Sequence, residues 1–378
     1  MNKRSCSVRT RFTREQRART RVVCALSVAA LALDAPAQRR DSTPSIVTFD
    51  GAQDGARSTV LVRFTGSDRA PQRLGEVTHA PGSARRGVVA RVRGRWSAFV
   101  VVAERPPHAG TYDSALYRVD ARGAARLVGG IANASTPIVT EAGDVVVERG
   151  VAGVTPTARG PLREDALEIA AVDSETGALR TALRRRGQLA FVGTALRGHE
   201  VLVYTVDGPS SALVSLDVAT GATRPIIANL QGIARDFSYD RARDTVVFAR
   251  GTAEGYELAT VAASGASASA TPVFRTQSEH LMPLSIGSGR VVLDSPDGRG
   301  LAVFDPRGAI RALSPLGSGI DRPRAVSGDW VAFEHRATRA ATTAHGLHHC
   351  AHGTTVSTTI ESGTDSVILG LIPAGESL

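Results

Sequence analysis

Short apolar segments recur along the chain, and each follows a glycine or a polar turn residue. Clear examples are Gly94–Val100, Gly198–Tyr204 and Gly328–Phe333. The segments begin near residues 45, 94, 143, 198, 243, 289 and 328, at intervals of 39 to 55 residues. Apolar runs of this length between turn residues predict β-strands. Beyond residue 40 no stretch has the apolar periodicity of a long amphipathic helix, so the pattern predicts an all-β chain.

A second apolar segment follows each of the first, and it usually ends in an acidic residue. It is seen in Ala115–Asp120, Leu167–Asp173 and Ala212–Asp217. A glycine-containing turn comes next, as in Asp173–Gly177, and a further strand runs from it. An acid at the first turn position and a glycine at the left-handed position are typical of tight hairpins. Each repeat therefore predicts three or four antiparallel strands.

A repeat of about 40–50 residues with this content is typical of a β-propeller. One blade of four strands cannot bury both of its faces, whereas radial stacking of blades buries them. Seven segment starts favour seven four-stranded antiparallel blades, and six remain possible if the first hairpin completes the last blade. Residues 337–353 match no blade strand and are predicted to be an irregular, histidine-containing segment. The remaining segments, Thr354–Ile360 and Asp365–Pro373, are candidates for the strands that close the ring.

The repeat resembles bacterial TolB-like and related YVTN/PQQ-like propellers. The strand-Asp-x-x-Thr-Gly units at 173–177 and 217–221 carry the resemblance, together with the stretch Ala325–Phe333. The resemblance spans about residues 45–335. It implies a ring of blades in which the links between second and third strands lie on the rim around a central channel. It implies a fold rather than a particular ligand.

The first 37 residues have the composition of a Sec-type export signal. A basic segment ends at Arg21, the apolar run Val22–Leu33 follows, and Ala35-Pro36-Ala37 offers a small-residue cleavage site. The apolar run is too short to cross a bilayer of about 30 Å as a helix, so we expect no membrane span in the mature chain. A buried N-terminal helix is the alternative. The sequence thus predicts a signal peptide at 1–37, a propeller domain at 38–378, and a periplasmic or extracellular location.

The positive charge of the chain is concentrated in the same segment. The net charge is +9, but residues 1–37 hold eight of the 45 cations and two of the 36 anions, which leaves +3 on the rest. The remaining chain has no concentrated basic stripe that would follow a phosphate backbone. We therefore expect no nucleic-acid partner, and no motif calls for a cofactor.

Two links between strands are long and come from consecutive repeats, at 104–113 and 150–165. Long loops on a rigid scaffold often hold binding residues. The predicted binding residues are Glu104, His108, Tyr112, Asp113, Arg163, Glu164 and Asp165. Solvated insertions without a binding role are the alternative interpretation.

Candidate chemistry elsewhere is sparse. His108 lies near Glu104 and Asp113 in the sequence, as a general base and its orienting acids would, but no nucleophile accompanies it, so we predict no catalytic residues. Four imidazoles and the Cys350 thiol fall within eight residues, and such groups bind zinc or copper. The candidate metal ligands are His345, His348, His349 and His352.

These features favour an exported, non-catalytic propeller that presents its loop rim to a protein or cell-envelope partner. A propeller enzyme of the lactonase, lyase or glycan-active type is the main alternative, with its site at the central channel. The innermost strands offer Asp236 and His280 for such a site. A metal-handling protein centred on 345–352 is a third hypothesis.

Overall fold

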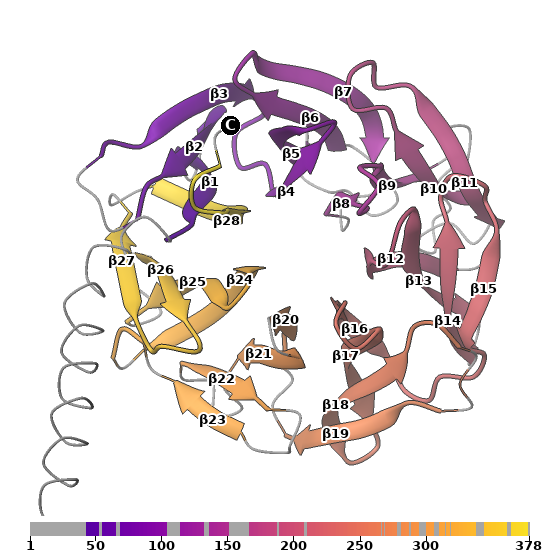
Figure 1. Cartoon of the computed structure of the whole chain (residues 1–378). Helices are drawn as coiled ribbons and strands as arrows, with labels where there is room; N and C mark the ends of the chain where they lie inside the picture. The colour runs from indigo at the N-terminus through magenta and orange to yellow at the C-terminus, as the bar shows by residue number, and fades with distance from the viewer. Residues whose placement is uncertain are drawn as a thin grey trace, which may run out of the picture. The chain divides into compact units, whose positions relative to one another are not determined.

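Twenty-eight β-strands lie in the described part of the chain, and they form antiparallel sheets set around a common axis (Figure 1). The structure is a computed structural model, and it describes residues 43–376 except for 53–54, 66–68, 104–113, 132–135, 151–165, 187–188, 208–209, 266, 268, 278–280, 287–288, 295–299, 306–309, 314, 318, 338–343 and 361–363. No α-helix occurs among these residues, and none of them forms a helix long and apolar enough to cross a membrane.

Each group of four strands has the same order from the axis outward. The innermost strands are β28 (Thr364–Ile372), β4 (Arg85–Val92), β8 (Ile138–Val139), β12 (Leu189–Ala195), β16 (Ala234–Asp240), β20 (Leu284–Ile286) and β24 (Ile320–Ser327). The second strands are β1 (Ser45–Ala52), β5 (Arg95–Ala103), β9 (Val145–Gly150), β13 (Glu200–Asp207), β17 (Thr245–Thr252), β21 (Arg290–Asp294) and β25 (Trp330–Arg336).

The outer half of each group follows the same order. The third strands are β2 (Arg57–Arg63), β6 (Ser114–Asp120), β10 (Ala166–Val172), β14 (Ser210–Asp217), β18 (Gly255–Ala262), β22 (Leu301–Phe304) and β26 (Ala344–His349). The outermost strands are β3 (Gln72–Thr78), β7 (Gly123–Ile131), β11 (Leu179–Arg186), β15 (Thr223–Ile227), β19 (Thr271–Thr276), β23 (Ile310–Leu313) and β27 (Thr355–Thr359). We number the groups as blades 1 to 7, starting with the one that contains β1.

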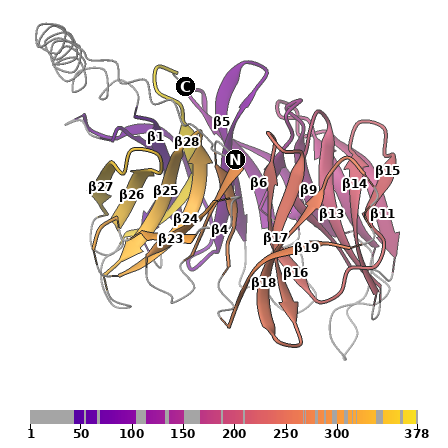
Figure 2. The ribbon, with the colours of Figure 1, turned by 60° about the horizontal axis from the view of Figure 1, so that its bottom comes forward.

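The described strands confirm the all-β propeller. Each innermost strand contacts the innermost strands of both neighbouring blades, so within the described residues they form a closed cycle of seven. The C-terminal strand β28 completes blade 1 by pairing with β1, and Figure 2 shows the two side by side. This arrangement matches the seven-blade alternative. The second strands begin within two residues of the seven starts expected from the sequence.

The core lies between blades rather than inside one sheet. Alternate residues of each second strand point to the two neighbouring blades, and these blades cover both faces of the strand. For example, Leu202 packs toward blade 5, against Phe248, while Val201 and Val203 pack toward blade 3, against Val146. A strand buried on both faces reads as a continuous apolar run, which is why the second strands are the clearest feature of the sequence.

The predicted acid-and-glycine hairpins are also present. Oδ1 of Asp173 accepts hydrogen bonds from the backbone N–H groups of Glu175 (3.0 Å) and Thr176 (2.8 Å). Gly177 has a φ of +73°, a conformation that glycine adopts without strain. Asp217 and Gly221 repeat the arrangement in blade 4.

The irregular segment predicted at 337–353 is wrong in its second half, because residues 344–349 form β26, the third strand of blade 7. This strand pairs with β25 and β27, and two of its three histidines, His345 and His348, are buried. The composition His-Gly-Leu-His-His hid the strand because it lacks an apolar run. Thr355–Thr359 and Thr364–Ile372 do supply closing strands, as β27 and β28.

Candidate functional site

The predicted binding residues lie in the two long links of blades 2 and 3. Glu104, His108, Tyr112, Asp113, Arg163, Glu164 and Asp165 all fall outside the described residues. The strand ends on either side of both links are described, however, and they place the points from which the links leave the sheet.

Blades 2 and 3 join into one eight-stranded sheet at that end of the strands. Consecutive pairings connect Ala103 to Ser114, Ser114 to Ile131, Ile131 to Arg149 and Arg149 to Glu168. We call these five residues the cross-blade row. The link 104–113 leaves directly from its first two members, and the link 151–165 begins and ends within three residues of its last two. Both links therefore start from a single continuous line of backbone.

Charged side chains lie at the outer end of the cross-blade row and on β11, the next strand outward. Nε of Arg184 donates a hydrogen bond of 2.7 Å to the buried carboxylate of Glu168. Nε of Arg149 is buried and has no hydrogen-bond partner among the described residues. The strand ends below the two links thus hold an ion pair between Arg184 and Glu168. They also hold the guanidinium of Arg149, whose Nε can still donate a hydrogen bond.

The two inner strands of blades 5 to 7 hold a second set of ionisable groups: Asp236 lies in β16, Asp294 in β21, and Arg322 and Arg324 in β24. Asp236 lies in a bulge of β16 and has a φ of +52°, which is unusual for a residue other than glycine. Burial raises the pKa of Asp236. Burial also raises the pKa of Asp294 to about 7, against the opposing charges of Arg322 and Arg324, and the negative charge of Asp236 adds to the rise. The fold therefore brings two carboxyl groups from different blades within electrostatic reach of each other.

A histidine and a carboxylate form a buried pair in blade 7. Nδ1 of His335 lies 2.6 Å from Oδ1 of Asp321, and the Asp321 side chain is fully buried. Burial raises the pKa of Asp321, and the hydrogen bond from His335 opposes the rise. A carboxylate in this position orients an imidazole for proton transfer. Among the described residues His335 makes no hydrogen bond to a hydroxyl or thiol. His108, weighed in the sequence as a general base, and His280, offered by the innermost strands, lie outside the described residues.

The fold separates the four candidate metal ligands. His345 points toward blade 1 and is fully buried, and His348 points the other way and hydrogen-bonds Thr355 (2.9 Å). Only His349 and His352 come together, with ring centroids 4.4 Å apart. Burial lowers the pKa of His345 to about 4, so this ring is neutral at pH 7. Among the described residues no group of three or more His, Cys, Asp or Glu side chains is arranged to hold a metal ion.

Cys350 is buried beside blade 6, where it packs with Val292 and Leu301. Burial raises the pKa of its thiol to about 11. A thiol this weakly ionised at neutral pH is a poor nucleophile and a poor metal ligand.

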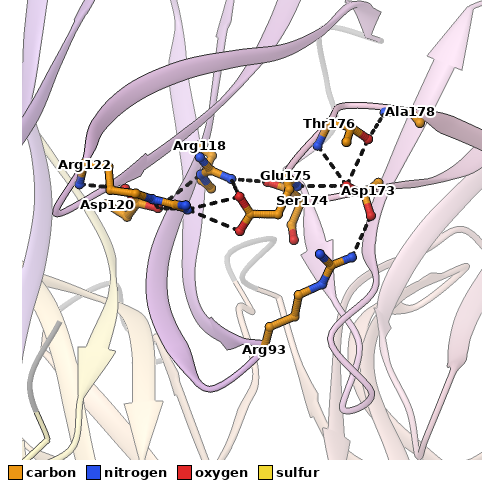
Figure 3. A network of polar contacts seen from close by, with 9 residues as sticks. All are labelled: Arg93, Arg118, Asp120, Arg122, Asp173, Ser174, Glu175, Thr176 and Ala178. Carbon is orange, nitrogen blue, oxygen red and sulfur yellow. Dashed lines mark hydrogen bonds and ion pairs between the residues drawn. The ribbon is translucent and has the colours of Figure 1, made fainter.

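Sequence reasoning missed a cavity at the opposite end of the same two blades. It has a volume of about 270 Å³, lies between blades 2 and 3, and has four arginines among the nine residues that line it. Figure 3 shows the network of polar contacts around it. The available signal was the pair Arg93 and Arg95 at a predicted hairpin turn. Strand pairing within blade 2 brings β6 beside this hairpin, and only blade stacking brings the β10–β11 turn to it.

Comparisons with known proteins show the fold and no family. No family model matches the sequence, and no curated protein is similar to it. The structure is similar to prolyl oligopeptidase B from Galerina marginata, with a TM-score of 0.57 and 12% identity over 93% of this chain and 57% of that one. It is also similar to a puromycin-hydrolyzing peptidase from Mycobacterium tuberculosis, with a TM-score of 0.56 and 15% identity over 84% of this chain and 53% of that one.

The chain thus spans little more than half the length of these peptidases. TolB from Acinetobacter baumannii also matches, with a TM-score of 0.46 and 13% identity over 85% of this chain and 81% of that one. The TM-scores above 0.5 with the two peptidases show a shared fold, and the low identities carry no assignment of activity.

Proposed function

We propose that this protein is an exported, non-catalytic β-propeller that binds a protein or cell-envelope component through the links 104–113 and 151–165. Residues 1–37 act as a Sec-type signal in this proposal, and the mature domain works in the periplasm or outside the cell. The TolB-like resemblance of the repeat agrees with such a setting. Glu104, His108 and Tyr112 in the first link and Arg163 to Asp165 in the second would make the contacts.

The observation that carries the proposal is the cross-blade row. Although the two links belong to different blades, both start from this one continuous row of paired backbone, which favours a shared binding surface. The strands from which both links start are held in one sheet, so the base of the proposed binding surface is already fixed before a partner binds. Loops held by a rigid scaffold are a common way for proteins to build recognition sites.

The enzyme alternative rests on a different observation, the raised pKa values of the two carboxyl groups Asp236 and Asp294, which belong to neighbouring blades. Perturbed carboxyl groups and a left-handed aspartate are features of catalytic sites as well as of structural ones. This alternative predicts a turnover that Asp236→Asn abolishes while partner binding continues.

Site-specific photo-crosslinking in the native host tests the proposal. A photoreactive amino acid replaces His108 or Arg163 in the full chain, and Ala219 serves as a control. Ala219 is exposed in the β14–β15 turn at the opposite end of the strands. We expect both link positions to yield the same crosslinked partner in the exported fraction and Ala219 to yield none. Equal adducts from all three positions, or none from the two links, would contradict the proposal.

A further inference from the structure

An arginine-lined pocket lies at the end of blades 2 and 3 opposite the two links. β5 runs from Arg95 beside the pocket to Ala103 in the cross-blade row, roughly 25–30 Å away. We define the arginine pocket by the side chains Arg93, Arg95, Ser97, Arg118, Arg122 and Glu175. Its volume of about 270 Å³ is below the roughly 300 Å³ at which pockets for drug-sized molecules begin, so it suits a small group.

Arg118 forms the fixed inner wall of the pocket. Its side chain is 10% exposed, and Nη1 donates to the backbone carbonyl of Ser174 (2.7 Å) and to Oε2 of Glu175 (2.8 Å). Arg118 belongs to β6 of blade 2, whereas Ser174 and Glu175 lie in the β10–β11 turn of blade 3. These bonds hold the guanidinium in place across the blade boundary before any ligand arrives (Figure 3).

Arg122 is held from both sides by carboxylates. Nη2 donates to Oδ2 of Asp120 (2.9 Å) and to both carboxylate oxygens of Glu175 (3.2 Å). Hydrogen bonding to Arg122 lowers the pKa of Glu175, so Glu175 stays ionised. Burial would raise the pKa of Asp120, but the bonds from Arg122 and the charge of Arg118 outweigh it and the pKa is lowered. The guanidinium groups of Arg118 and Arg122 thus already bind one oxyanion, the carboxylate of Glu175.

Arg93 enters the pocket from a strained turn. Its φ is +50° and that of Gly94 is +78°, the signs of a type I′ hairpin turn, in which Asn, Asp or Gly is usual. A positive φ is unfavourable for arginine, so Arg93 destabilises this turn relative to Asn, Asp or Gly at the same position. Nη2 of Arg93 donates to Oδ2 of Asp173 (2.7 Å), which aims the side chain across the blade boundary. Strain of this kind is often kept where a side chain has a functional position.

The charges of the pocket are unbalanced. Four guanidinium groups belong to it, while the only carboxylates bonded to them are Asp120, Asp173 and Glu175 among the described residues. Backbone hydrogen bonds from Thr176 and Glu175 lower the pKa of Asp173 to about 2, so it is ionised as well. The guanidinium without a partner in the described part of the chain is Arg95, which is exposed at the pocket mouth.

We propose that the arginine pocket binds a phosphate or sulfate group. Its donors come from two sides. Arg93 lies in the β4–β5 turn and Arg95 at the start of β5, while Arg118 lies in β6 and Arg122 in the turn after it. A tetrahedral oxyanion can accept hydrogen bonds from several directions, whereas a planar carboxylate accepts a bidentate pair in one plane. Glu175 already provides the carboxylate that pairs with Arg122 in this way. Arginine forks match phosphate and sulfate oxygens, and prior fixation of Arg118 and Arg122 lowers the entropy cost of binding.

Isothermal titration calorimetry of the purified chain with inorganic phosphate, sulfate and acetate tests the proposal. We expect saturable binding of one phosphate or one sulfate per chain, and weaker binding of acetate. Arg95→Gln should weaken phosphate binding about tenfold, because it removes a charge-assisted hydrogen bond. The matched control is Arg91→Gln, which removes one charge from the same hairpin but sits outside the pocket, bonded to Glu376 and to the carbonyl of Gly94.

A second pair of variants tests the pocket in the opposite direction. Glu175→Gln should tighten phosphate binding several-fold, because it removes the negative charge that faces the cavity. Glu141→Gln, an acid bonded to Arg241 elsewhere on the same rim, should leave binding within twofold. Phosphate that does not saturate, acetate bound as tightly as phosphate, or equal losses in Arg95→Gln and Arg91→Gln would each overturn the proposal.

Glucose 6-phosphate in the same titration identifies the source of the group. Tighter binding than inorganic phosphate assigns the pocket to a phosphate ester, and weaker binding assigns it to the free ion. The result is independent of the proposed partner surface, because the pocket and the two links are at opposite ends of the strands.

Discussion

Glu148 shows how a single residue completes the hydrogen bonding between two blades. It lies in β9 of blade 3, and its carboxylate accepts a hydrogen bond of 2.5 Å from the backbone N–H of Val192 in blade 4. Val192 sits at an irregularity in the pairing of β12 with β13, where the regular ladder shifts. Burial raises the pKa of Glu148 to about 7, against the effect of that hydrogen bond.

This pKa predicts a pH-dependent cost in stability. An unfolded glutamate titrates near pH 4.3. Between about pH 4.3 and 7 the folded state therefore binds more protons than the unfolded state, and the free energy of unfolding falls as the pH rises. Glu148→Gln keeps the acceptor and removes the charge. Relative to the parent, the variant should gain up to about 3 kcal/mol between pH 4.5 and 7.5.

Urea unfolding of both proteins at several pH values measures the gain. Glu254→Gln is the control, because the Glu254 side chain is 77% exposed and has little desolvation to lose. A stability difference between parent and Glu148→Gln that stays constant with pH would refute the assignment of the raised pKa to this residue.

At the scale of elements, β26 shows how packing makes a strand from an unpromising sequence. Gly346 lies opposite Phe333 in the neighbouring strand β25. A Cβ atom on Gly346 would come within 2.2 Å of the Phe333 ring, so the glycine provides the space that this large side chain occupies. His345 and His348 on either side act as bulky neutral groups between blades.

We expect Gly346→Ala to destabilise the protein by about 1–3 kcal/mol, the usual cost of overpacking a buried site. Thermal or urea unfolding measures the change. Gly265→Ala is the matched control, since a Cβ there has open space and its φ is not in the left-handed region. This control should stay within about 0.5 kcal/mol of the parent. If the two variants were equally stable, residues 344–349 would not be packed as a blade strand.

At the scale of the whole ring, closure depends on the last strand. β28 pairs with β1 from Ser45 to Ala52, and its apolar residues pack on both neighbouring blades. Leu369 and Ile372 join the layer between blades 1 and 2, and Ile368 and Leu371 join the layer toward blade 7. The buried Arg85 of β4 adds a polar link, with bonds to Ser58 and Asp365.

Removal of residues 361–378 should therefore open the ring. It leaves β1 with an unpaired edge and exposes two apolar layers, a combination that favours aggregation. We expect loss of the single cooperative unfolding transition in calorimetry, and oligomers in size-exclusion chromatography. Removal of 374–378 alone keeps β28 and should preserve the transition. A monomeric, cooperatively unfolding chain without 361–378 would contradict closure by this strand.

Much of the fold could be predicted because its signals are local. Asp173 and Gly177 specify a hairpin through bonds within five residues, and the second strands are continuous apolar runs because both their faces are buried. Repetition of these local units then implied the ring. β26 escaped prediction because its stability comes from the fit of Gly346 and two histidines against other blades.

The candidate sites depended more on the tertiary structure. The sequence alone determined the strand repeat, the hairpin turns and the positions of the two long links. Only the folded ring decided that these links leave one continuous row, that His345 and His348 face opposite ways, and that Arg93, Arg118 and Glu175 meet across a blade boundary. The physical reason is that turns and strands obey contacts between near neighbours, whereas a pocket between blades is made by residues up to 82 positions apart.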